Sequence, residues 1–273
     1  MSWVEFIFKL KVDSSKDILI AKLASLGFDS FDETHDDLKA YIDKEKVTST
    51  FLELVKKNSQ LDFKYLCLEN KNWNVLWESN FSPILIDNQC FIRAPFHQKM
   101  NVKYDILINP KMSFGTGHHE TTKMMILELI HFKERPRKVL DVGCGTAILS
   151  IISEKLWASE VLAIDIDQWA IENSLENINI NKCVNIDVEK GDIQTQKKSF
   201  KYDLILANIN TNVLLKDFNL YFDFLESNGH LIISGFLDKD FLKIKEKSLF
   251  FNFSLISQKE ENKWQCVVLK KIE

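Results

Sequence analysis

One short segment in the middle of the chain constrains its fold more than any other. Apolar residues lead directly into a glycine, a second glycine follows two positions later, and residues 139–147 read VLDVGCGTA. This pattern predicts a buried strand, a tight turn and a helix, because glycine permits left-handed backbone angles and a close approach to a ligand. Such a unit is typical of α/β folds in which ligands bind at the carboxyl ends of parallel strands.

The pattern on both sides of this segment predicts a parallel sheet with helices on each face. Strands are expected over 139–142, 161–164, 186–189, 204–207 and 231–234, with helical patterns ending near Trp157 and beginning at Gln168 and Asn212. Such alternation indicates a doubly covered parallel sheet. Two last strands, 249–256 and 264–270, flank a charged turn over 258–263 and predict a closing antiparallel hairpin. Strand-like pieces over 84–93 and 104–108 precede the glycine segment.

The first seventy residues or so follow a different pattern. Strands are expected over 4–12, 28–34, 38–43 and 63–68, and helices over 14–26 and 47–57. The order β-α-β-β-α-β is that of a ferredoxin-like α+β module, with Gly27 ending the first helix. Trp73 and Trp77 lie four residues apart and predict a linker helix. We therefore expect a ferredoxin-like domain over 1–69, a linker over 70–82 and a Rossmann-like α/β domain over 83–273.

Composition narrows the class of protein. The chain has 273 residues, of which 45% are apolar and 27% charged, with a net charge of −4, as in an ordinary globular protein. No apolar run reaches the roughly 20 residues that a membrane span needs, and charges at Glu5, Lys9 and Lys11 argue against a signal peptide, so a cytoplasmic location is expected. The five cysteines show no CxxC spacing, which argues against a disulfide framework or a zinc site.

The slightly negative net charge of the chain also indicates which kind of partner it would bind. Only Arg93, Arg135 and Arg137 among the 35 basic residues are arginines, and no basic run is present. A large surface that follows nucleic-acid phosphates is therefore not expected. A basic protein partner suits the chain better.

An acidic residue beyond the glycine segment indicates the kind of cofactor. Asp165 follows the next predicted strand, where a carboxylate commonly binds the ribose hydroxyls of a nucleoside. Ile148 occupies the position of the third glycine in a dinucleotide-binding GxGxxG motif, which disfavours a dinucleotide. Asp141, just before Gly143 and Gly145, would attract a cationic ligand rather than a pyrophosphate. S-adenosyl-L-methionine, with its sulfonium and amino groups, fits these residues best.

Two further stretches are too specific for generic scaffold, namely NPKMSFGTGHHETT over 109–122 and LILANIN over 204–210. With the glycine segment, they make the chain resemble the methyltransferases of large-subunit ribosomal protein eleven, a family of class I S-adenosylmethionine-dependent enzymes. The matching segments are FGTGHHETT, DVGCGTA, IDID over 164–167, ANI over 207–209, SGF over 234–236, the Trp73/Trp77 pair and Trp264.

The resemblance carries specific expectations about fold and site. It implies a Rossmann-like class I methyltransferase sheet preceded by a small domain that grips the protein substrate. The cofactor-binding residues it implies are Thr122, Gly143, Asp165 and Asn208, with Phe114, Gly115 and Thr116 shaping the loop around the methionine end. The implied reaction methylates lysine ε-amino groups and the N-terminal α-amino group of the ribosomal protein and releases S-adenosyl-L-homocysteine. Neither a metal, a membrane nor direct nucleic-acid contact is required, and a monomer is expected. His118 and Glu120 depart from the family pattern, which bears on the substrate loop and not on the class.

Two residues are candidates for a catalytic role. Asn208 offers an uncharged carbonyl acceptor that suits the orientation of an amine hydrogen. His119 is a candidate general base because its ordinary pKa lies near 6.5. The adjacent histidines His118 and His119 do not form an HExxH motif, so no metal is expected there.

Three other functions compete with this interpretation. A nucleic-acid amino-methyltransferase would stack a flipped base on an aromatic residue of an Asn-Pro-Pro-aromatic motif, whereas Ile209, Asn210 and Thr211 follow Asn208 here. A nicotinamide-dependent oxidoreductase is disfavoured by Ile148 and would be revealed by binding of reduced nicotinamide cofactor. A non-catalytic ribosome-associated module would bind S-adenosylmethionine without methylating any ribosomal protein.

Overall fold

The computed structural model describes residues 3–9, 19–20, 22–23, 26–28, 30–33, 37–59, 61–67, 82–109, 115–196 and 200–272. The chain divides into two compact units, 1–79 and 80–273. The predicted linker over 70–82, with Trp73 and Trp77, lies almost wholly outside the described residues, as does Phe114. The boundaries of the linker therefore stay a prediction.

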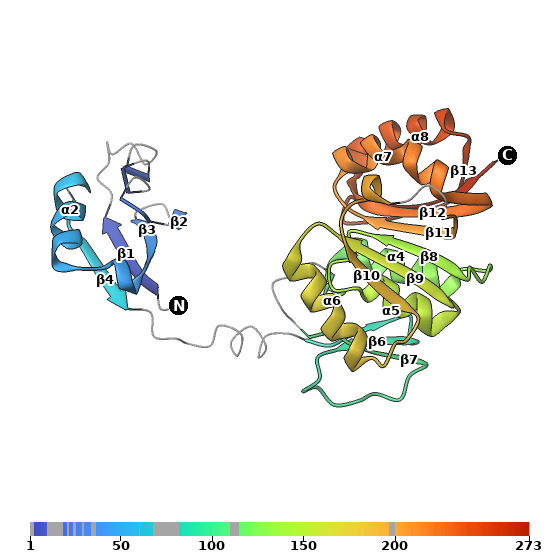
Figure 1. Ribbon diagram of the computed structural model, residues 1–273, viewed down its shortest axis with the longest axis horizontal. Coiled ribbons are helices and arrows are strands. Elements are labelled where there is room, and N and C mark those ends of the chain that lie inside the picture. Colours follow the sequence, from blue (N-terminus) through green and yellow to red (C-terminus); the bar gives the residue numbers. More distant parts are fainter. Residues whose placement is uncertain are drawn as a thin grey trace. The chain divides into compact units, whose positions relative to one another are not determined.

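The first unit contains a four-stranded antiparallel sheet (Figure 1). Its elements are β1 (Trp3–Lys9), β2 (Ser30–Glu33), β3 (Asp37–Asp43), η1 (Lys44–Lys46), α2 (Ser49–Ser59) and β4 (Phe63–Cys67). Of the helix predicted over 14–26, the described residues 19–20 and 22–23 are helical. The strand order β2-β3-β1-β4 is the ferredoxin-like arrangement that the sequence predicts.

The core of this unit follows from the alternation of its strands. Val4, Phe6 and Phe8 of β1 point to one face, and all three are at most 1% exposed. The Phe6 ring packs edge-on against that of Phe28, 5.1 Å away between centroids. Val55 of α2 completes the same apolar cluster. The alternation of apolar residues along β1 in the sequence thus identifies the buried face of this strand.

The second unit is built on a seven-stranded sheet in the order β10-β9-β8-β11-β12-β14-β13. These strands are β8 (Lys138–Val142), β9 (Glu160–Asp165), β10 (Ile186–Lys190), β11 (Tyr202–Asn208), β12 (Leu225–Leu237), β13 (Phe253–Glu261) and β14 (Trp264–Lys271). Neighbouring strands from β10 to β12 are parallel, while β14 pairs antiparallel with both β12 and β13. The predicted parallel sheet with a closing antiparallel hairpin is confirmed.

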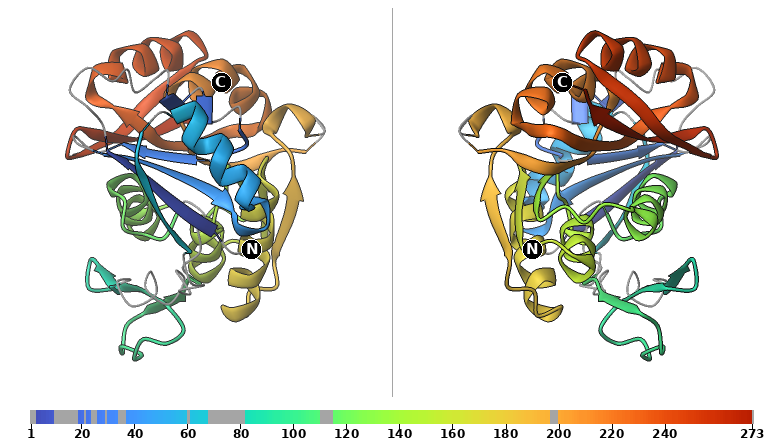
Figure 2. Two further views of the ribbon diagram at one scale, coloured as in Figure 1. Left: turned by 90° about the vertical axis from the view of Figure 1, so that its left-hand side faces the viewer. Right: turned by 90° about the vertical axis from the view of Figure 1, so that its right-hand side faces the viewer.

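Helices cover both faces of this sheet (Figures 1 and 2). The helices are α4 (Glu120–His131), α5 (Ile148–Leu156), α6 (Gln168–Ile180), α7 (Thr211–Phe224) and α8 (Phe241–Phe250), with short turns η2 (Ile193–Thr195) and η3 (Asp238–Asp240). One apolar core joins α4, α5 and α6 to one face, and a second joins α7 and α8 to the other. The sheet is therefore buried on both sides, as its continuous apolar strands require.

Two segments differ from the sequence-based expectation. The strand predicted over 84–93 is a hairpin of β5 (Ile84–Ile86) and β6 (Cys90–Arg93), and β6 pairs in parallel with β7 (Tyr104–Leu107). Asp87 and Asn88 turn the chain with φ angles of 50° and 53°, and three residues form the loop because Ile86 pairs with Cys90. The small sheet packs on α4 and α5. It lies on the side of the main sheet away from α7 and α8 (Figure 2).

The second difference is helix α8, which was not predicted. The strand expected over 249–256 begins only at Phe253, and Leu249 and Phe250 belong to the last turn of α8. Only Ile244 and Ser248 of this helix are buried, while Leu242 is 68% exposed and Phe250 79% exposed. Apolar residues on the solvent side hide the helical period in the sequence.

Candidate active site

The glycine segment forms a turn at the carboxyl end of β8. The amides of Gly143 and Cys144 both donate to the carbonyl oxygen of Ile164, at 2.9 and 3.0 Å, which ties the turn to the neighbouring strand β9. Gly143 and Gly145 have φ angles of 72° and 56°, in the left-handed region. A Cβ atom at Gly143 would lie 2.4 Å from Cγ2 of Ile209. Gly143 is therefore required both by the backbone angle and by the close packing of the turn on the chain after β11.

Asp165 stands at the end of β9 with its carboxylate held in place. Its Oδ2 accepts from the Gly145 amide at 2.9 Å, and its Oδ1 accepts from the Asp167 amide at 3.0 Å. Each carboxylate oxygen has a second lone pair, so the side chain retains acceptor capacity toward a ligand. Two backbone amides thus hold the carboxylate in one orientation.

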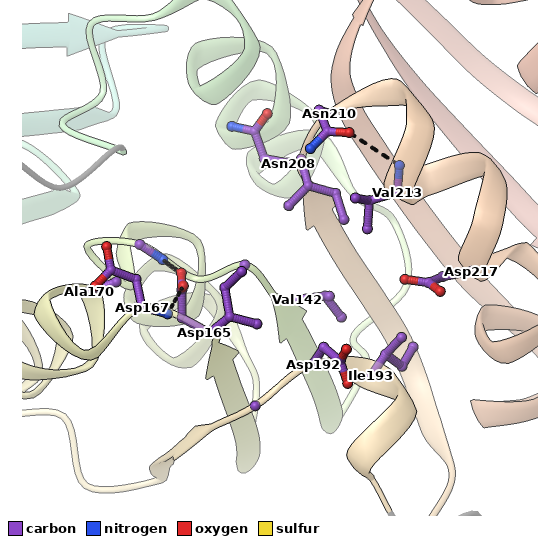
Figure 3. Close-up of a pocket in the computed structure, with 15 residues that line it drawn as sticks. Val142, Asp165, Asp167, Ala170, Asp192, Ile193, Asn208, Asn210, Val213 and Asp217 are labelled. Carbon is purple, nitrogen blue, oxygen red and sulfur yellow. Dashed lines mark hydrogen bonds between the residues drawn. The ribbon is translucent and has the colours of Figure 1, made fainter.

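A cleft of about 390 Å³ opens beside these two turns (Figure 3). Four of the predicted site residues line it, namely Gly143, Gly145, Asp165 and Asn208. The other lining residues are Val142, Ile166, Asp167, Ala170, Gly191, Asp192, Ile193, Ile209, Asn210, Val213 and Asp217. The carboxyl ends of four parallel strands converge here, where open α/β sheets bind ligands.

Asn208 joins this cleft to the start of α4. Its Nδ2 donates to Oγ1 of Thr122, a buried residue, over 3.3 Å. Its Oδ1 is buried and accepts no hydrogen bond from any residue that the structure describes. A buried acceptor without a donor is costly unless a ligand supplies one. The structure therefore brings Asn208 and Thr122 together and leaves the Asn208 carbonyl without a donor among the described residues.

Gly115 and Thr116 lie on a loop attached to the glycine turn. The carbonyl of Gly115 accepts from Oγ1 of Thr146 at 2.6 Å. Oγ1 of Thr116 lies 3.2 Å from Nδ1 of His118, whose Nε2 lies 3.0 Å from the Ser82 carbonyl oxygen. Neither Gly115 nor Thr116 lines the cleft, so their predicted contact with the cofactor stays a prediction.

His119 caps the amino terminus of α4. Its Nδ1 accepts from the Thr121 amide at 3.3 Å and lies 2.9 Å from Oγ1 of Thr121. The His119 ring also packs edge-on against Trp264, with 4.8 Å between ring centroids. Because Nδ1 accepts an amide hydrogen, the neutral ring carries its own proton on Nε2, and a general base would have to give up the cap. The base role stays a prediction, whereas the capping contact is a property of the fold.

Asp141 is buried beneath the glycine turn and does not line the cleft. Oγ of Ser150 donates to its Oδ2 at 2.6 Å. Burial raises the pKa of Asp141 from 3.8 to about 7, and the nearby charge of Asp165 adds to the increase. Its predicted attraction for a cationic ligand would have to act through the turn.

The Asp141→Asn variant is expected to be more stable than the unchanged chain above pH 7. The raised pKa means that the folded protein holds a proton that the unfolded chain loses, so stability falls as pH rises from about 4 to about 7. The loss amounts to roughly 4 kcal/mol at most. Asparagine removes this loss and keeps an acceptor for Ser150, so urea unfolding of the two proteins should diverge between pH 4 and pH 8. The exposed-site variant Asp187→Asn should keep the original pH profile, and an Asp141→Asn protein that is equally destabilised at both pH values would contradict the expectation.

The sequence did not identify the far side of the cleft. Asp192 and Ile193 follow β10, Val213 and Asp217 lie on α7, and all four line the cavity. In the sequence, the pair Gly191–Asp192 at the end of a predicted strand could have indicated Asp192 and Ile193.

No metal-binding group of three or more His, Cys, Asp or Glu residues occurs among the described residues. Nor does any described helix have the length and apolar character needed to cross a membrane.

Comparisons with known proteins agree with this geometry. The family model for ribosomal protein L11 methyltransferase (PrmA) matches residues 16–272. A ribosomal protein L11 methyltransferase of Bacteroides thetaiotaomicron is 38% identical over 98% of this chain and 99% of its own, and one from Chlorobaculum parvum is 31% identical over 98% and 96%. A crystal structure of the ribosomal protein L11 methylase from Lactobacillus delbrueckii subsp. bulgaricus aligns with a TM-score of 0.66 and 26% identity, covering 71% of this chain and all of that one. A methyltransferase from Pyrococcus furiosus, at a TM-score of 0.52 and 17% identity over 62% of this chain and 90% of its own, shares the fold. This chain belongs to the ribosomal protein L11 methyltransferase family.

Proposed function

We propose that this chain transfers methyl groups from S-adenosyl-L-methionine to amino groups of ribosomal protein L11. The acceptors proposed are lysine ε-amino groups and the N-terminal α-amino group, and the second product is S-adenosyl-L-homocysteine. The single observation that carries the proposal is the buried, unpartnered carbonyl of Asn208 at the edge of the cleft that Asp165 and the glycine turn shape. The family named by its relatives supports the substrate.

The residues of the cleft suit this cofactor. Asp165 would accept from the ribose hydroxyls, the turn at Gly143 and Gly145 would pass closely behind the methionine portion, and Thr122 would support that end through Asn208. When bound, S-adenosyl-L-methionine supplies an electrophilic methyl group on a sulfonium. The chain itself has to orient the acceptor and exclude water.

The acceptor nitrogen must be neutral before it can attack. A lysine amine with an ordinary pKa near 10.4 is neutral to only about one part in a thousand at neutral pH, and an α-amine with a pKa near 8 is far better placed. Burial beside a cation would lower either pKa. The Asn208 carbonyl suits the orientation of a neutral amine because it accepts a hydrogen bond without adding a charge.

The remaining parts of the proposal concern the partner and the setting. The ferredoxin-like domain over 1–69 would grip the ribosomal protein, and the linker over 70–82 would connect it to the methyltransferase domain. Phe114, Gly115 and Thr116 would complete the loop around the methionine end, and His119 would position α4 through its cap. The chain would act as a monomer in the cytoplasm, without a metal and without direct contact to nucleic acid.

The decisive experiment measures the intact mass of purified ribosomal protein L11 after incubation with this protein and S-adenosyl-L-methionine. Mass gains in whole methyl steps are expected, and peptide mapping should place them on amines. The Asn208→Ala variant should bind the cofactor more weakly, because Asn208 supports its methionine end, and at saturating cofactor it should methylate about 100-fold more slowly, because it lacks the acceptor that orients the amine. Cofactor binding without any mass gain would overturn the proposed substrate, and absence of cofactor binding would overturn the cofactor as well.

A further inference from the structure

Helix α6 exposes two large apolar side chains on the face that points away from the sheet. Trp169 is 76% exposed and Leu175 is 52% exposed. Trp169, Glu172 and Leu175 follow one another at intervals of three residues, and Glu176 lies four residues after Glu172, so these four residues share one side of the helix. We call them the outer face of α6. Tryptophan is mostly buried in folded proteins, and an exposed apolar surface around one is typical of a surface that binds a partner.

The outer face of α6 is also negatively charged. Glu172 and Glu176 lie on it, and α6 contains no lysine or arginine. Glu172 accepts a hydrogen bond from Nε2 of Gln168 at 3.2 Å, and Glu176 accepts one from Nδ2 of an asparagine at 3.4 Å. Because both of these donors are neutral, they leave the charges of the carboxylates in place. The face therefore attracts a cationic partner and repels the phosphates of nucleic acids and of anionic lipids.

This face begins at the rim of the cleft. Asp167 and Ala170, at the start of α6, line the cleft, whereas Trp169 does not (Figure 3). Farther along the helix, the asparagine that donates to Glu176 is Asn109, the first residue of the segment 109–122. A protein that brings an amine to the cleft can therefore contact the outer face of α6 at the same time.

We propose that the outer face of α6 is a docking surface for a lysine-bearing segment of the protein substrate. This inference rests on the proposed function, because it takes the substrate to be a protein that offers amino groups. Lysine amines, with an ordinary pKa near 10.4, are almost all protonated at neutral pH, so such a segment complements the carboxylates of Glu172 and Glu176. The Trp169 ring can pack against the apolar stem of a lysine and attract its ammonium group. Tryptophan is common among the few residues that contribute most of the binding energy of an interface.

The test measures initial rates of methylation of ribosomal protein L11 by the full chain at saturating S-adenosyl-L-methionine. Trp169→Ala is expected to raise the KM for ribosomal protein L11 about 10-fold, and Glu172→Lys about 3-fold. In both variants kcat should stay within about twofold, and calorimetry should show an unchanged affinity for S-adenosyl-L-homocysteine, because neither side chain lines the cleft. Added salt should raise the KM of the unchanged protein more than that of Glu172→Lys.

Helix α8 offers a matched control for each variant. Phe250 is an aromatic residue that is 79% exposed, Glu246 is an exposed acid, and neither lines the cleft. Phe250→Ala and Glu246→Lys should leave the KM for ribosomal protein L11 within about twofold of the unchanged value. Increases in KM as large as those of the α6 variants would overturn the inference, because the effect would not belong to the outer face of α6.

The other outcomes separate this inference from the proposed function. Unchanged KM values for Trp169→Ala and Glu172→Lys, with methylation retained, would overturn the inference alone. A weaker affinity for S-adenosyl-L-homocysteine would overturn it by placing Trp169 in the cofactor site. A changed oligomeric state in size-exclusion chromatography, or a lower Tm of the free chain, would overturn it by identifying a second copy or another part of this chain as the occupant. Absence of methylation by the unchanged chain would overturn the proposed function together with the inference.

Discussion

Replacing Asp165 with alanine is expected to weaken cofactor binding by about 1000-fold. The carboxylate would bind two ribose hydroxyls, and each hydrogen bond to a charged group contributes about 1.5–3 kcal/mol. The same oxygens accept from the amides of Gly145 and Asp167, so the variant also loses what orients the glycine turn against β9. Calorimetric titration with S-adenosyl-L-homocysteine measures the effect, and methyl transfer should need far more cofactor to saturate.

The matched control for this variant is Asp187→Ala. Asp187 is an exposed acidic residue on the neighbouring strand β10 and does not line the cleft, so its removal changes the net charge by the same amount. Its cofactor affinity should stay within about twofold of the unchanged protein, since surface substitutions remote from a site have small effects. Equal affinities of Asp165→Ala and Asp187→Ala for the cofactor would show that the site has been assigned wrongly.

The Gly235→Ala variant is expected to lose roughly 3 to 5 kcal/mol of stability in the methyltransferase unit. Gly235 has a φ angle of 95°, and a Cβ atom there would lie 2.2 Å from the backbone oxygen of Ile209 and 2.8 Å from its carbonyl carbon. Backbone atoms cannot rotate away as side chains do, so the methyl group adds overpacking to left-handed backbone strain. Ile209 follows Asn208, so the displacement should also impair cofactor binding. Chemical unfolding and calorimetric titration measure the two effects.

Gly27 provides an unusually close control. Its φ angle is 94°, nearly that of Gly235, but a Cβ atom there would meet no atom of the described residues within 4 Å. Gly27→Ala should therefore show the backbone strain alone, about 1–2 kcal/mol, and should leave cofactor binding unchanged. The difference between the stability losses of the two variants measures the cost of the close contact between Gly235 and Ile209. If Gly235→Ala cost no more than Gly27→Ala, the packing of the chain after β11 on Gly235 would not be as the structure describes it.

Much of the fold could be predicted because it depends on local pattern. Alternating apolar residues in β1 and continuous apolar runs in β8, β9 and β11 report how many faces of each strand are buried. The order of strands and helices then limits the topology, since parallel crossovers are right-handed. Helix α8 and the β5–β6 hairpin were missed for local reasons, the exposed apolar side chains of α8 and the short Asp87–Asn88 turn.

Local sequence pattern likewise identified some residues of the candidate site and missed others. Gly143, Gly145, Asp165 and Asn208 were identified because each follows a predicted parallel strand, and the carboxyl ends of such strands share one edge of the sheet. Phe114 lies outside the described residues, and the direct cofactor contacts of Thr122, Gly115, Thr116 and Asp141 remain predictions. Asp217 was missed because it sits on the second turn of a helix, where nothing in the sequence distinguishes an acid facing a cleft from one facing solvent.

By itself, the sequence determined the two kinds of fold, the edge of the sheet at which the candidate site lies and the family resemblance, because these depend on residue types at fixed local spacings. The tertiary structure alone decided which distant residues meet. Asn208 donates a hydrogen bond to Thr122, and Nδ1 of His119 caps helix α4. Asp141 is buried, and Asp217 lines the cleft. The physical reason is that burial and hydrogen-bond geometry depend on how separate elements pack, and the spacing of residues along one strand or helix does not record that packing.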